Sequence, residues 1–416
     1  MGEYRITGGI GLKGEVTIGG GKNAVLPILA AAVLGKKSII HNCPKISDTY
    51  CTIGILKELG CDVSFEDNTI TVDAGGIKFW QLPAAHAAKM RSSIIFAGGL
   101  LGRFGQAAVH YPGGCHLGKR PIDLHLEAFK QLGAKIVEED AIYVRADKLA
   151  GAKIHLKCPS VGATQNAMLA AVLAEGTTVI QNAAREPEIV DLQKFLRAGG
   201  AKVMGAGGPV IVIEGVKELG DVEHTIMPDR IVAGTYLAAA AITGGHIRVN
   251  KINHEDIRPI TIYLARAGCL VAEEKNSAVL SAPNRLQALG HIVTGPHPDF
   301  PTDMQPQFAA LMAAAEGKSV ISEKVFESRD KHVAELAKMG ANIHNTGGTR
   351  FHITGVNRLH GGIVRAHDLR CGAALIMAGL AAEGKTIVKD SIHVERGYEA
   401  IERDLQALGA DVRFVK

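Results

Sequence analysis

The sequence lacks the features that mark several classes of protein. Its formal net charge is only +4, with no concentrated run of lysine and arginine, so nucleic acid is not expected as a partner. No apolar run reaches about 18 residues without a charge or a glycine, so no membrane span is expected. The polar, glycine-rich opening MGEYRITGGIGLKGEV lacks the apolar segment that a signal peptide needs.

Paired cysteines are also missing. The 7 cysteines are dispersed, odd in number and never arranged as C-x-x-C. This pattern disfavours a disulfide framework and a zinc site, and it fits a reducing cytoplasm. No metal and no cofactor are predicted, and the sequence assigns no oligomeric state.

What the chain does contain is typical of a packed globular enzyme. Apolar residues make up 47% of the sequence and charged residues 21%. Because 416 residues exceed what one hydrophobic core usually supports, two domains of roughly 200 residues each are expected. The 49 glycines and the low aromatic content of 5% indicate short turns and closely packed helices.

One sequence unit recurs six times at intervals of roughly 70 residues. Its clearest mark is a helix that ends in L-G-A or a close variant, followed by a short alternating strand. These marks begin at Leu59, Leu132, Gly199, Ala267, Met339 and Leu408. An alanine-rich helix, a glycine turn and a β-branched strand precede each mark, as in NAMLAAVLAEGTTVIQN.

The composition of the two helices in each unit predicts their burial. The alanine-rich helix is apolar on most faces and is expected to be buried, whereas the second helix is amphipathic and belongs at the surface. Three such units packed around a common axis bury their apolar faces, so six units give two similar α/β domains. The boundary falls near Pro228, and the first twenty or so residues could supply a strand to either domain.

The residues that open the six buried helices are charged or form hydrogen bonds. They are Lys22-Asn23, Lys89-Met90-Arg91, Gly162-Ala163-Thr164, Asp229-Arg230, Thr302-Asp303 and Asp368-Leu369-Arg370. Parallel helices bring their N-termini to one end, where backbone N–H groups attract anions. If the two domains face each other with these ends, one cleft is lined by Lys22, Arg91, Arg120, Arg370 and Arg396. For each cation taken singly, a solvated surface charge is the alternative.

A glycine-rich loop, HYPGGCHLGKRPIDLH, runs from His110 to His125. Its glycines would let it move as a lid over a cleft. Cys115 follows a glycine pair and precedes the basic pair Lys119-Arg120, and nearby positive charge lowers the pKa of a thiol. The alternative for Cys115 is a small buried apolar residue.

Four motifs in this order make the sequence similar to a known family. They are GGGKNAVLP around Lys22, GGCHLGKRPIDLH around Cys115, FPTDMQPQF around Asp303 and ERGYEAIERDL around Arg396. With them the chain resembles the enolpyruvyl transferases over essentially all 416 residues. The resemblance implies two inside-out α/β barrels of three repeats each. The first comprises residues 22–228, and the second residues 1–21 together with 229–416.

The resemblance also implies the reaction. The enolpyruvyl group of phosphoenolpyruvate moves to the 3-hydroxyl of UDP-N-acetylglucosamine by addition and elimination of phosphate, the first committed step of peptidoglycan synthesis. Cys115 would protonate C3 of phosphoenolpyruvate, and Asp303 would accept the proton of the sugar hydroxyl. A helix cap is the alternative role for Asp303. The phosphate and carboxylate of phosphoenolpyruvate would be bound by Lys22, Asn23, Arg120 and Arg396, with Lys22 counted among the catalytic residues.

The resemblance assigns further residues to the nucleotide sugar and to support of the site. The nucleotide sugar would contact Arg91, Arg120, Pro121, Ile122, Asp123, Leu124, Ser160, Val161, Gly162, Asp303 and Val325. Three residues, Asp368, Arg370 and Arg329, would support the closed state. His125 would contact the uridine diphosphate or would be a buried histidine with its hydrogen bonds satisfied.

Two features depart from the family pattern. His116 follows the reactive cysteine, and His367 and Cys371 flank Asp368-Leu369-Arg370, where Cys371 could place a second thiol near the cleft.

Two other functions are alternatives to this transfer. A transferase like 5-enolpyruvylshikimate-3-phosphate synthase shares fold and reaction type, but that family lacks the GGC loop. A non-catalytic repeat protein that binds nucleotide sugars is the alternative outside enzymes.

Overall fold

The computed structural model describes residues 2–82, 84–87, 89–111, 113 and 122–416. Within these residues the chain forms two compact units. The N-terminal unit comprises the described residues from Gly20 to Met227. The C-terminal unit comprises residues 2–19 and 228–416.

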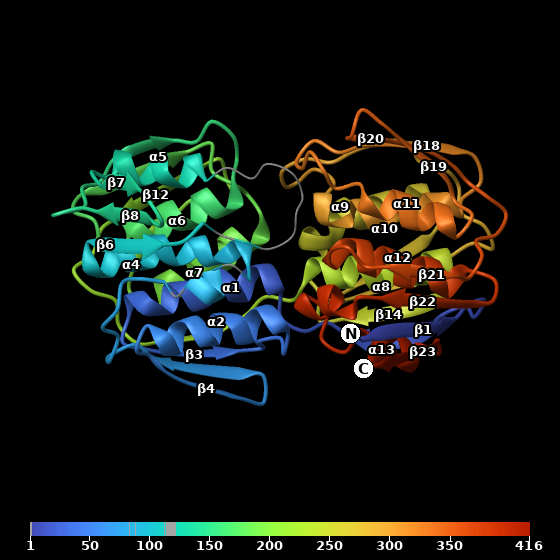
Figure 1. The fold of residues 1–416 in the computed structure, drawn as a ribbon, viewed down its shortest axis with the longest axis horizontal. Coiled ribbons are helices and arrows are strands. Elements are labelled where there is room, and N and C mark those ends of the chain that lie inside the picture. Colours follow the sequence, from blue (N-terminus) through green and yellow to red (C-terminus); the bar gives the residue numbers. More distant parts are fainter. Residues whose placement is uncertain (1, 83, 88, 112, 114–121) are drawn as a thin grey trace. The chain divides into compact units, whose positions relative to one another are not determined.

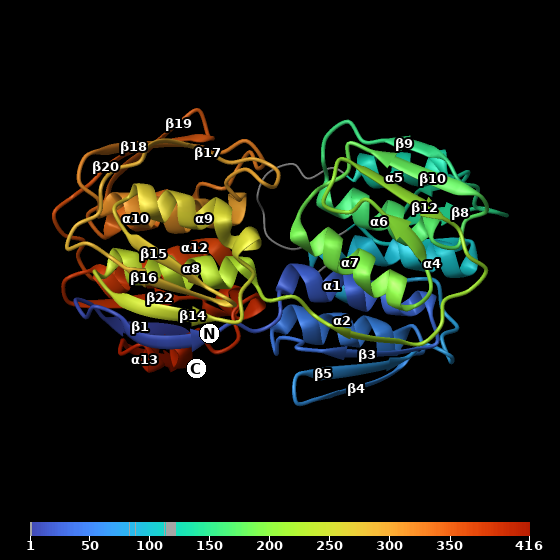
Figure 2. The same ribbon diagram turned by 180° about the vertical axis from the view of Figure 1, so that it is seen from behind.

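In the N-terminal unit, apolar helices lie inside and sheets lie outside (Figures 1 and 2). The helices are α1 (Lys22–Ala31), η1 (Ala32–Leu34), α2 (Ser47–Glu58), α3 (Ala84–Ala87), η2 (Arg91–Ile95), α4 (Phe96–Phe104), α5 (Asp123–Gln131), α6 (Val161–Ala171) and α7 (Pro187–Ala198). The strands are β3 (Lys37–His41), β4 (Asp62–Glu66), β5 (Thr69–Asp73), β6 (Gln106–Val109), β7 (Lys135–Glu138), β8 (Ile142–Arg145), β9 (Lys153–His155), β10 (Thr177–Gln181), β11 (Lys202–Met204), β12 (Val210–Glu214) and β13 (Val222–Thr225).

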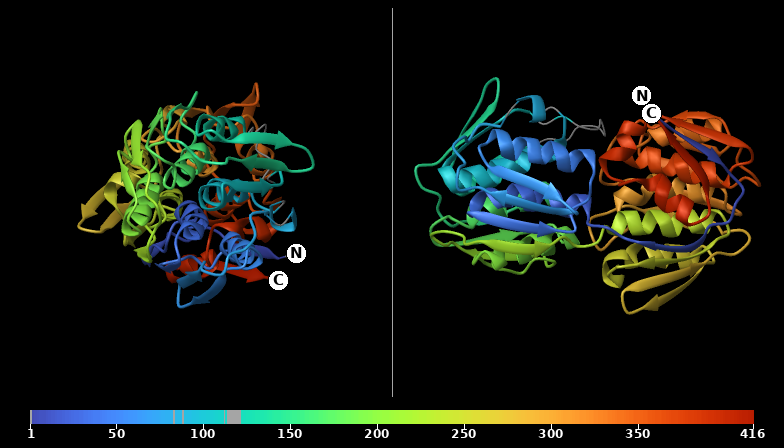
Figure 3. Two further views of the ribbon diagram at one scale, coloured as in Figure 1. Left: turned by 90° about the vertical axis from the view of Figure 1, so that its left-hand side faces the viewer. Right: turned by 90° about the horizontal axis from the view of Figure 1, so that it is seen from below.

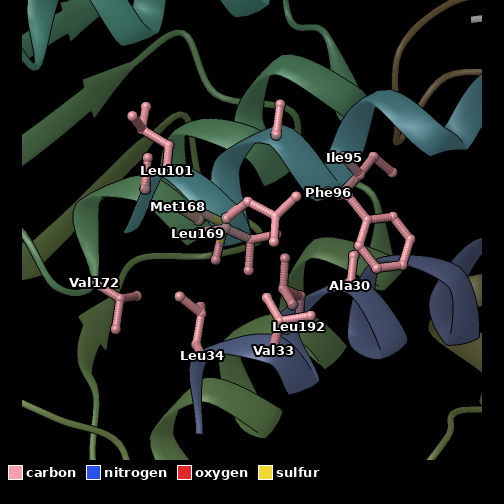
Figure 4. Close-up of a cluster of buried hydrophobic side chains, with 14 of the residues drawn as sticks. Ala30, Val33, Leu34, Ile95, Phe96, Leu101, Met168, Leu169, Val172 and Leu192 are labelled. Atoms are coloured by element: carbon pink, nitrogen blue, oxygen red, sulfur yellow. The ribbon is translucent and has the colours of Figure 1, made fainter. Parts of the chain in front are cut away.

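The core of this unit forms where α1, α4 and α6 meet (Figure 4). Phe96 and Leu101 of α4 pack near Met168 and Leu169 of α6, all within one buried apolar cluster. Because these three helices are apolar on nearly every side, they are stable only when neighbours cover them all round. The expectation that the alanine-rich helices are buried is confirmed.

The C-terminal unit has the same construction. Its helices are α8 (Arg230–Ile242), α9 (His254–Arg266), η3 (Thr302–Met304), α10 (Gln305–Ala313), α11 (Lys331–Lys338), α12 (Leu369–Ala381), η4 (Ser391–Arg396) and α13 (Ile401–Ala407). Its strands are β1 (Glu3–Thr7), β2 (Lys13–Thr17), β14 (His246–Asn250), β15 (Leu270–Glu274), β16 (Ser277–Ser281), β17 (Gly290–Val293), β18 (Lys318–Ser322), β19 (Asn342–Thr346), β20 (Arg350–Thr354), β21 (Ile363–Arg365), β22 (Lys385–Lys389) and β23 (Asp411–Val415). The buried helices α8, α10 and α12 pack against one another.

The sheets repeat one strand order. Sheets β9-β10-β12-β11, β13-β3-β5-β4, β2-β14-β16-β15, β17-β18-β20-β19 and β21-β22-β1-β23 each begin with a parallel pair and continue with antiparallel pairs. The sheet β6-β8-β7 has the antiparallel pairs, and a single parallel bridge from Gln81 to Ala108 stands in for its first strand. The sequence repeat is therefore also a repeat of topology.

The first strands of the chain complete two sheets of the C-terminal unit. β1 lies between β22 and β23 and pairs antiparallel with both, so Glu3 faces Lys389 on one side and Val415 on the other. The N- and C-terminal strands consequently lie side by side (Figure 3). β2 pairs in parallel with β14. The question of which unit receives the opening strand is thus decided by long-range pairing.

The L-G-A marks of the repeat are helix ends of one type. Each glycine, Gly60, Gly133, Gly200, Gly268, Gly340 and Gly409, has a positive φ between 84° and 100°. The N–H of the next residue bonds to the carbonyl five residues earlier, at 2.9 to 3.1 Å, as in Cys61 to Leu56. This is the Schellman motif, whose left-handed position favours glycine because a Cβ would be strained there. The repeat is visible in the sequence because this backbone turn constrains it.

Within the part of the chain that the structure describes, no helix combines the length and the apolar character that crossing a bilayer requires.

Candidate active site

Asp303 lies in the short helix η3, which leads into α10. Its carboxylate accepts a hydrogen bond from Arg329, with Nη1 2.9 Å from Oδ1, and another from Arg370, with Nη2 2.8 Å from Oδ2. Bonds between charged groups at these distances are short and strong. The N-cap position of η3 is occupied by Pro301, so the alternative of Asp303 as the cap of this turn does not hold.

The two arginines decide the protonation state of Asp303. Burial by itself raises the pKa of this carboxyl, but the charges and hydrogen bonds of Arg370 and Arg329 outweigh burial and hold the pKa well below its usual range. Burial likewise lowers the pKa of Arg370, but Asp303, together with Tyr398 and Asp229, more than reverses that effect. The cluster therefore keeps an ionised carboxylate between two fixed cations at neutral pH.

The openings of the central helices converge in the C-terminal unit. Asp368 is the N-cap of α12, and its Oδ1 accepts from the backbone N–H of Arg370 at 2.9 Å. Asp229 is the N-cap of α8, and its charge acts on Arg370. Arg370 in turn reaches Asp303 at the opening of α10. The expectation that parallel helices gather their polar openings is confirmed for this unit.

Tyr398 supports Arg370 and was not assigned a role from the sequence. Its hydroxyl lies 2.9 Å from Thr235 Oγ1 and accepts from Arg370 Nη1 at 3.4 Å. The tyrosine is buried, and burial raises its pKa. The only signal in the sequence was its position in the RGYE motif beside Arg396.

Arg396 ends the short helix η4 and is half-buried. Burial, followed by the charge of Arg396, lowers the pKa of His393 in the same helix. His393 is therefore favoured in its neutral form, and Arg396 provides positive charge at this position.

Lys22 is the first residue of α1 in the N-terminal unit. Its ammonium lies 2.8 Å from Oδ2 of Asp48, and both side chains are largely buried. The alternative of a solvated surface charge is therefore wrong for Lys22, and it is also wrong for Arg370, whose side chain is only 4% exposed. Asp48 was missed from the sequence because nothing in the motif ISDTY distinguishes it from an ordinary residue in the first turn of α2. Asn23 follows Lys22 and is half-buried.

Arg91 and Ser160 also stand at helix openings of this unit. Arg91 is the first residue of η2 and is half-buried, and burial lowers the pKa of its guanidinium. Ser160 caps α6 by accepting from the N–H of Ala163 at 3.3 Å.

His125 is a buried histidine rather than an exposed one. Its Nδ1 accepts from Asn166 Nδ2 at 2.7 Å, and Asn166 also bonds to Ile94 and to the N–H of Gly98. Gly162 lies against this ring, and a Cβ at that position would meet His125 Cε1 at 2.9 Å. The local structure thus explains both the histidine and the glycine through packing.

The remaining residues that are predicted to contact the nucleotide sugar lie at the starts of α5 and α6 and in the segment after β18. Ile122 is buried and precedes α5, Asp123 is the exposed first residue of α5, and Leu124 is half-buried. Val161 is the first residue of α6. Val325 is exposed in the segment after β18.

Three predicted site residues, Cys115, Arg120 and Pro121, lie outside the described residues, as does His116. Cys371, in contrast, is fully buried, and burial raises the pKa of its thiol strongly. Cys371 is therefore not an accessible second thiol, because α12 turns this residue into the core.

Among the residues with described positions, no group of three or more histidine, cysteine, aspartate or glutamate side chains is arranged to hold a metal ion.

The family model described as EPSP synthase (3-phosphoshikimate 1-carboxyvinyltransferase) matches residues 6–405. The structure resembles the enolpyruvyl transferase NikO from Streptomyces tendae, with a TM-score of 0.90 and 27% sequence identity over 100% of this chain and 99% of that one. An EPSP synthase from Acinetobacter baumannii, at 19% identity, has the same fold with a TM-score of 0.76 over the full length of both chains. The chain belongs to the enolpyruvyl transferase family, and its mixed α/β fold is the fold of that family.

Curated relatives that share one name match nearly the whole chain. UDP-N-acetylglucosamine 1-carboxyvinyltransferase 2 of Caldanaerobacter subterraneus is 48% identical over 99% of both chains. UDP-N-acetylglucosamine 1-carboxyvinyltransferase 1 of Symbiobacterium thermophilum is 49% identical over 99% of this chain and 95% of its own. A relative of that name from Clostridium tetani is 45% identical over 99% of both chains. The resemblance inferred from the four motifs is confirmed.

Proposed function

We propose that this chain transfers the enolpyruvyl group of phosphoenolpyruvate to the 3-hydroxyl of UDP-N-acetylglucosamine and releases phosphate. The observation that carries the proposal is the 45% to 49% identity, over nearly the whole chain, to relatives named for this transfer. The paired Asp303 cluster of the C-terminal unit adds independent support. The reaction would belong to peptidoglycan synthesis in the cytoplasm.

The chemistry is an addition followed by an elimination. The sugar oxygen bonds to C2 of phosphoenolpyruvate while C3 gains a proton. The resulting tetrahedral adduct then loses a proton from C3 as the bond from C2 to the phosphate oxygen breaks. The site must therefore supply an acid, a base and fixed positive charge for two anionic groups.

Asp303 is the proposed proton acceptor for the 3-hydroxyl. It is ionised at neutral pH, as an acceptor must be, because Arg329 and Arg370 stabilise its charge. The same stabilisation makes it a weak base. Its basicity would rise as substrate anions compete for the two arginines, so substrate binding and proton acceptance would be linked.

Fixed positive charge would come from lysine and arginine side chains. Lys22 and Arg396, with Asn23 and Arg120, would bind the phosphate and carboxylate of phosphoenolpyruvate through charge-assisted hydrogen bonds. An ammonium has three N–H donors, so the ion pair of Lys22 with Asp48 is compatible with a bond to a phosphate oxygen.

Cys115 is the proposed acid that protonates C3. The nucleotide sugar would be bound by the residues that the resemblance assigns, which include Arg91, Ser160 and Val325, and Asp368, Arg370 and Arg329 would support the site. The finer description of the fold is that each unit is an inside-out α/β barrel of three repeats, with domains 22–228 and 1–21 plus 229–416. The repeated sheet order around central helices supports this description.

The proposal is tested by measuring phosphate release from phosphoenolpyruvate with each candidate acceptor. Release that requires UDP-N-acetylglucosamine is expected, and Asp303→Asn should abolish most of it. Release that requires shikimate 3-phosphate instead would replace the proposal with the sister reaction. Binding of the nucleotide sugar without any release would favour a non-catalytic protein.

A further inference from the structure

Glu323 directly follows β18, and its side chain is almost completely buried at 2% exposure. Its Oε1 accepts from Thr294 Oγ1 at 2.9 Å and from the backbone N–H groups of Val325 and Phe326 at 2.8 and 3.1 Å. Its Oε2 accepts from Thr302 Oγ1 at 2.8 Å. Burial of a carboxyl group is unfavourable unless donors satisfy its oxygens, and here four donors do so.

The bonds at Oε1 shape the segment after β18. They draw two successive backbone N–H groups onto one oxygen, and Thr294 secures the turn by accepting from the N–H of Lys324 at 2.9 Å. The side chain of Val325, 43% exposed, is consequently held at the surface of the unit. Val325 is the residue of this segment that is assigned to the nucleotide sugar.

The bond at Oε2 connects Glu323, through Thr302 and Arg329, to the proposed base Asp303. The Thr302 hydroxyl has one hydrogen, which it donates to Glu323, so its lone pair is directed to accept from Arg329 Nη1 at 2.9 Å. The same Nη1 donates to Asp303 Oδ1 at 2.9 Å. The two oxygens of Glu323 thus lead to two different parts of the proposed site.

We propose that Glu323 is a positioning residue for the transfer, because its carboxyl group fixes the Val325 segment and the Asp303–Arg329 pair in one relative geometry. This inference rests on the proposed function. A nucleotide sugar bound at Val325 presents its 3-hydroxyl productively only if Asp303 lies at a fixed place relative to that segment. A small misalignment of a reacting group lowers the rate of proton transfer much more than it lowers binding.

The substitution Glu323→Gln keeps one of the two acceptor oxygens and replaces the other with an NH2 group, so it tests their roles separately. Its amide oxygen can still accept from Thr294 and the two backbone N–H groups, so the Val325 segment should be retained. The amide nitrogen cannot accept from Thr302, so the bond that orients Arg329 is lost. We expect kcat to fall about tenfold while KM for UDP-N-acetylglucosamine stays within about twofold. Glu327→Gln, the same change at an exposed position of the same segment, is the matched control and should leave both constants unchanged.

A double-substitution cycle tests whether the effect passes through Thr302. Thr302→Val removes the hydroxyl with little change of shape and should lower kcat by a similar factor. If Glu323 acts through Thr302, the double variant should lose no more activity than either single variant. Full multiplication of the two losses would overturn the inference. If Glu323→Gln fails to fold, Thr302→Val alone decides, and an unchanged kcat in that variant would overturn it.

Assays of the unaltered chain distinguish a failure of this inference from a failure of the proposed function on which it rests. Absence of phosphate release in the unaltered chain with both substrates would overturn the proposed function and the inference with it. Normal release in the unaltered chain, with kcat unchanged in Glu323→Gln, would overturn the inference alone. A rise in KM with unchanged kcat would do the same, because it would assign Glu323 only to binding.

Discussion

Replacement of Arg370 by methionine should destabilise the C-terminal unit markedly. Methionine keeps much of the length and apolar volume of the side chain but removes its charge and donors. In the structure, Arg370 donates to Asp303 at 2.8 Å and to the Tyr398 hydroxyl at 3.4 Å, and its side chain is almost fully buried. The substitution leaves Asp303, whose side chain is only 21% exposed, with one arginine instead of two.

The size of the effect follows from the burial of the pair. Removing one partner of a buried ion pair typically lowers the free energy of unfolding by 3–5 kcal/mol. Because Arg329 still neutralises Asp303, we expect the lower end, about 3 kcal/mol. For a unit of roughly 200 residues this corresponds to a fall in the melting temperature of about 6–12 °C.

The pH dependence provides a second check with a defined sign. The pKa of Asp303 is lower in the folded chain than in the unfolded chain, so its ionised form stabilises the fold above the unfolded pKa of about 4. That contribution is lost as the pH falls toward the folded pKa. With Arg370→Met the shift is smaller, so the difference in stability between the two proteins should be full at pH 7 and should shrink below about pH 4.

Urea unfolding of both proteins at neutral and acidic pH measures this difference. Arg358→Met is the control, because Arg358 forms an exposed ion pair with Glu383 and its loss should have a much smaller effect. The double variant Asp303→Asn with Arg370→Met should lose less stability than the sum of the single variants. An Arg370→Met variant as stable as Arg358→Met would refute the reasoning from the buried cluster.

Two further predictions concern packing and thiol chemistry. Gly162→Ala should lower the free energy of unfolding by about 1–3 kcal/mol, because the new Cβ displaces the His125 ring from Asn166. Thermal melting measures this loss, and adding His125→Ala to the same chain should restore part of it. Fosfomycin should alkylate the peptide that contains Cys115 and leave Cys371 unmodified, because Cys371 is buried with a raised pKa; mass spectrometry that found the adduct on Cys371 would contradict its burial.

The candidate site was predictable where a motif or the opening of a repeated helix marked it. Lys22 and Asp303 were identified because they stand in motifs shared with a known family. Arg370 and Arg329 were also predicted as site residues, but the sequence did not pair them with Asp303, and it did not identify Asp48 as the partner of Lys22. Arg370 lies 67 residues from Asp303, and Asp48 opens an ordinary helix, so no local pattern links either residue to its partner. Glu323 gave no signal, since its role depends on four donors that only folding brings together.

The sequence by itself determined the repeating unit, the buried helices and the helix ends. These features depend on local chemistry: an apolar helix needs cover on all sides, and the left-handed turn after each surface helix favours glycine, as at Gly60. Tertiary structure alone decided that β1 fills the gap between β22 and β23. An alternating strand has the same local signal wherever it pairs, and only the open backbone edges left by the last repeat select its place.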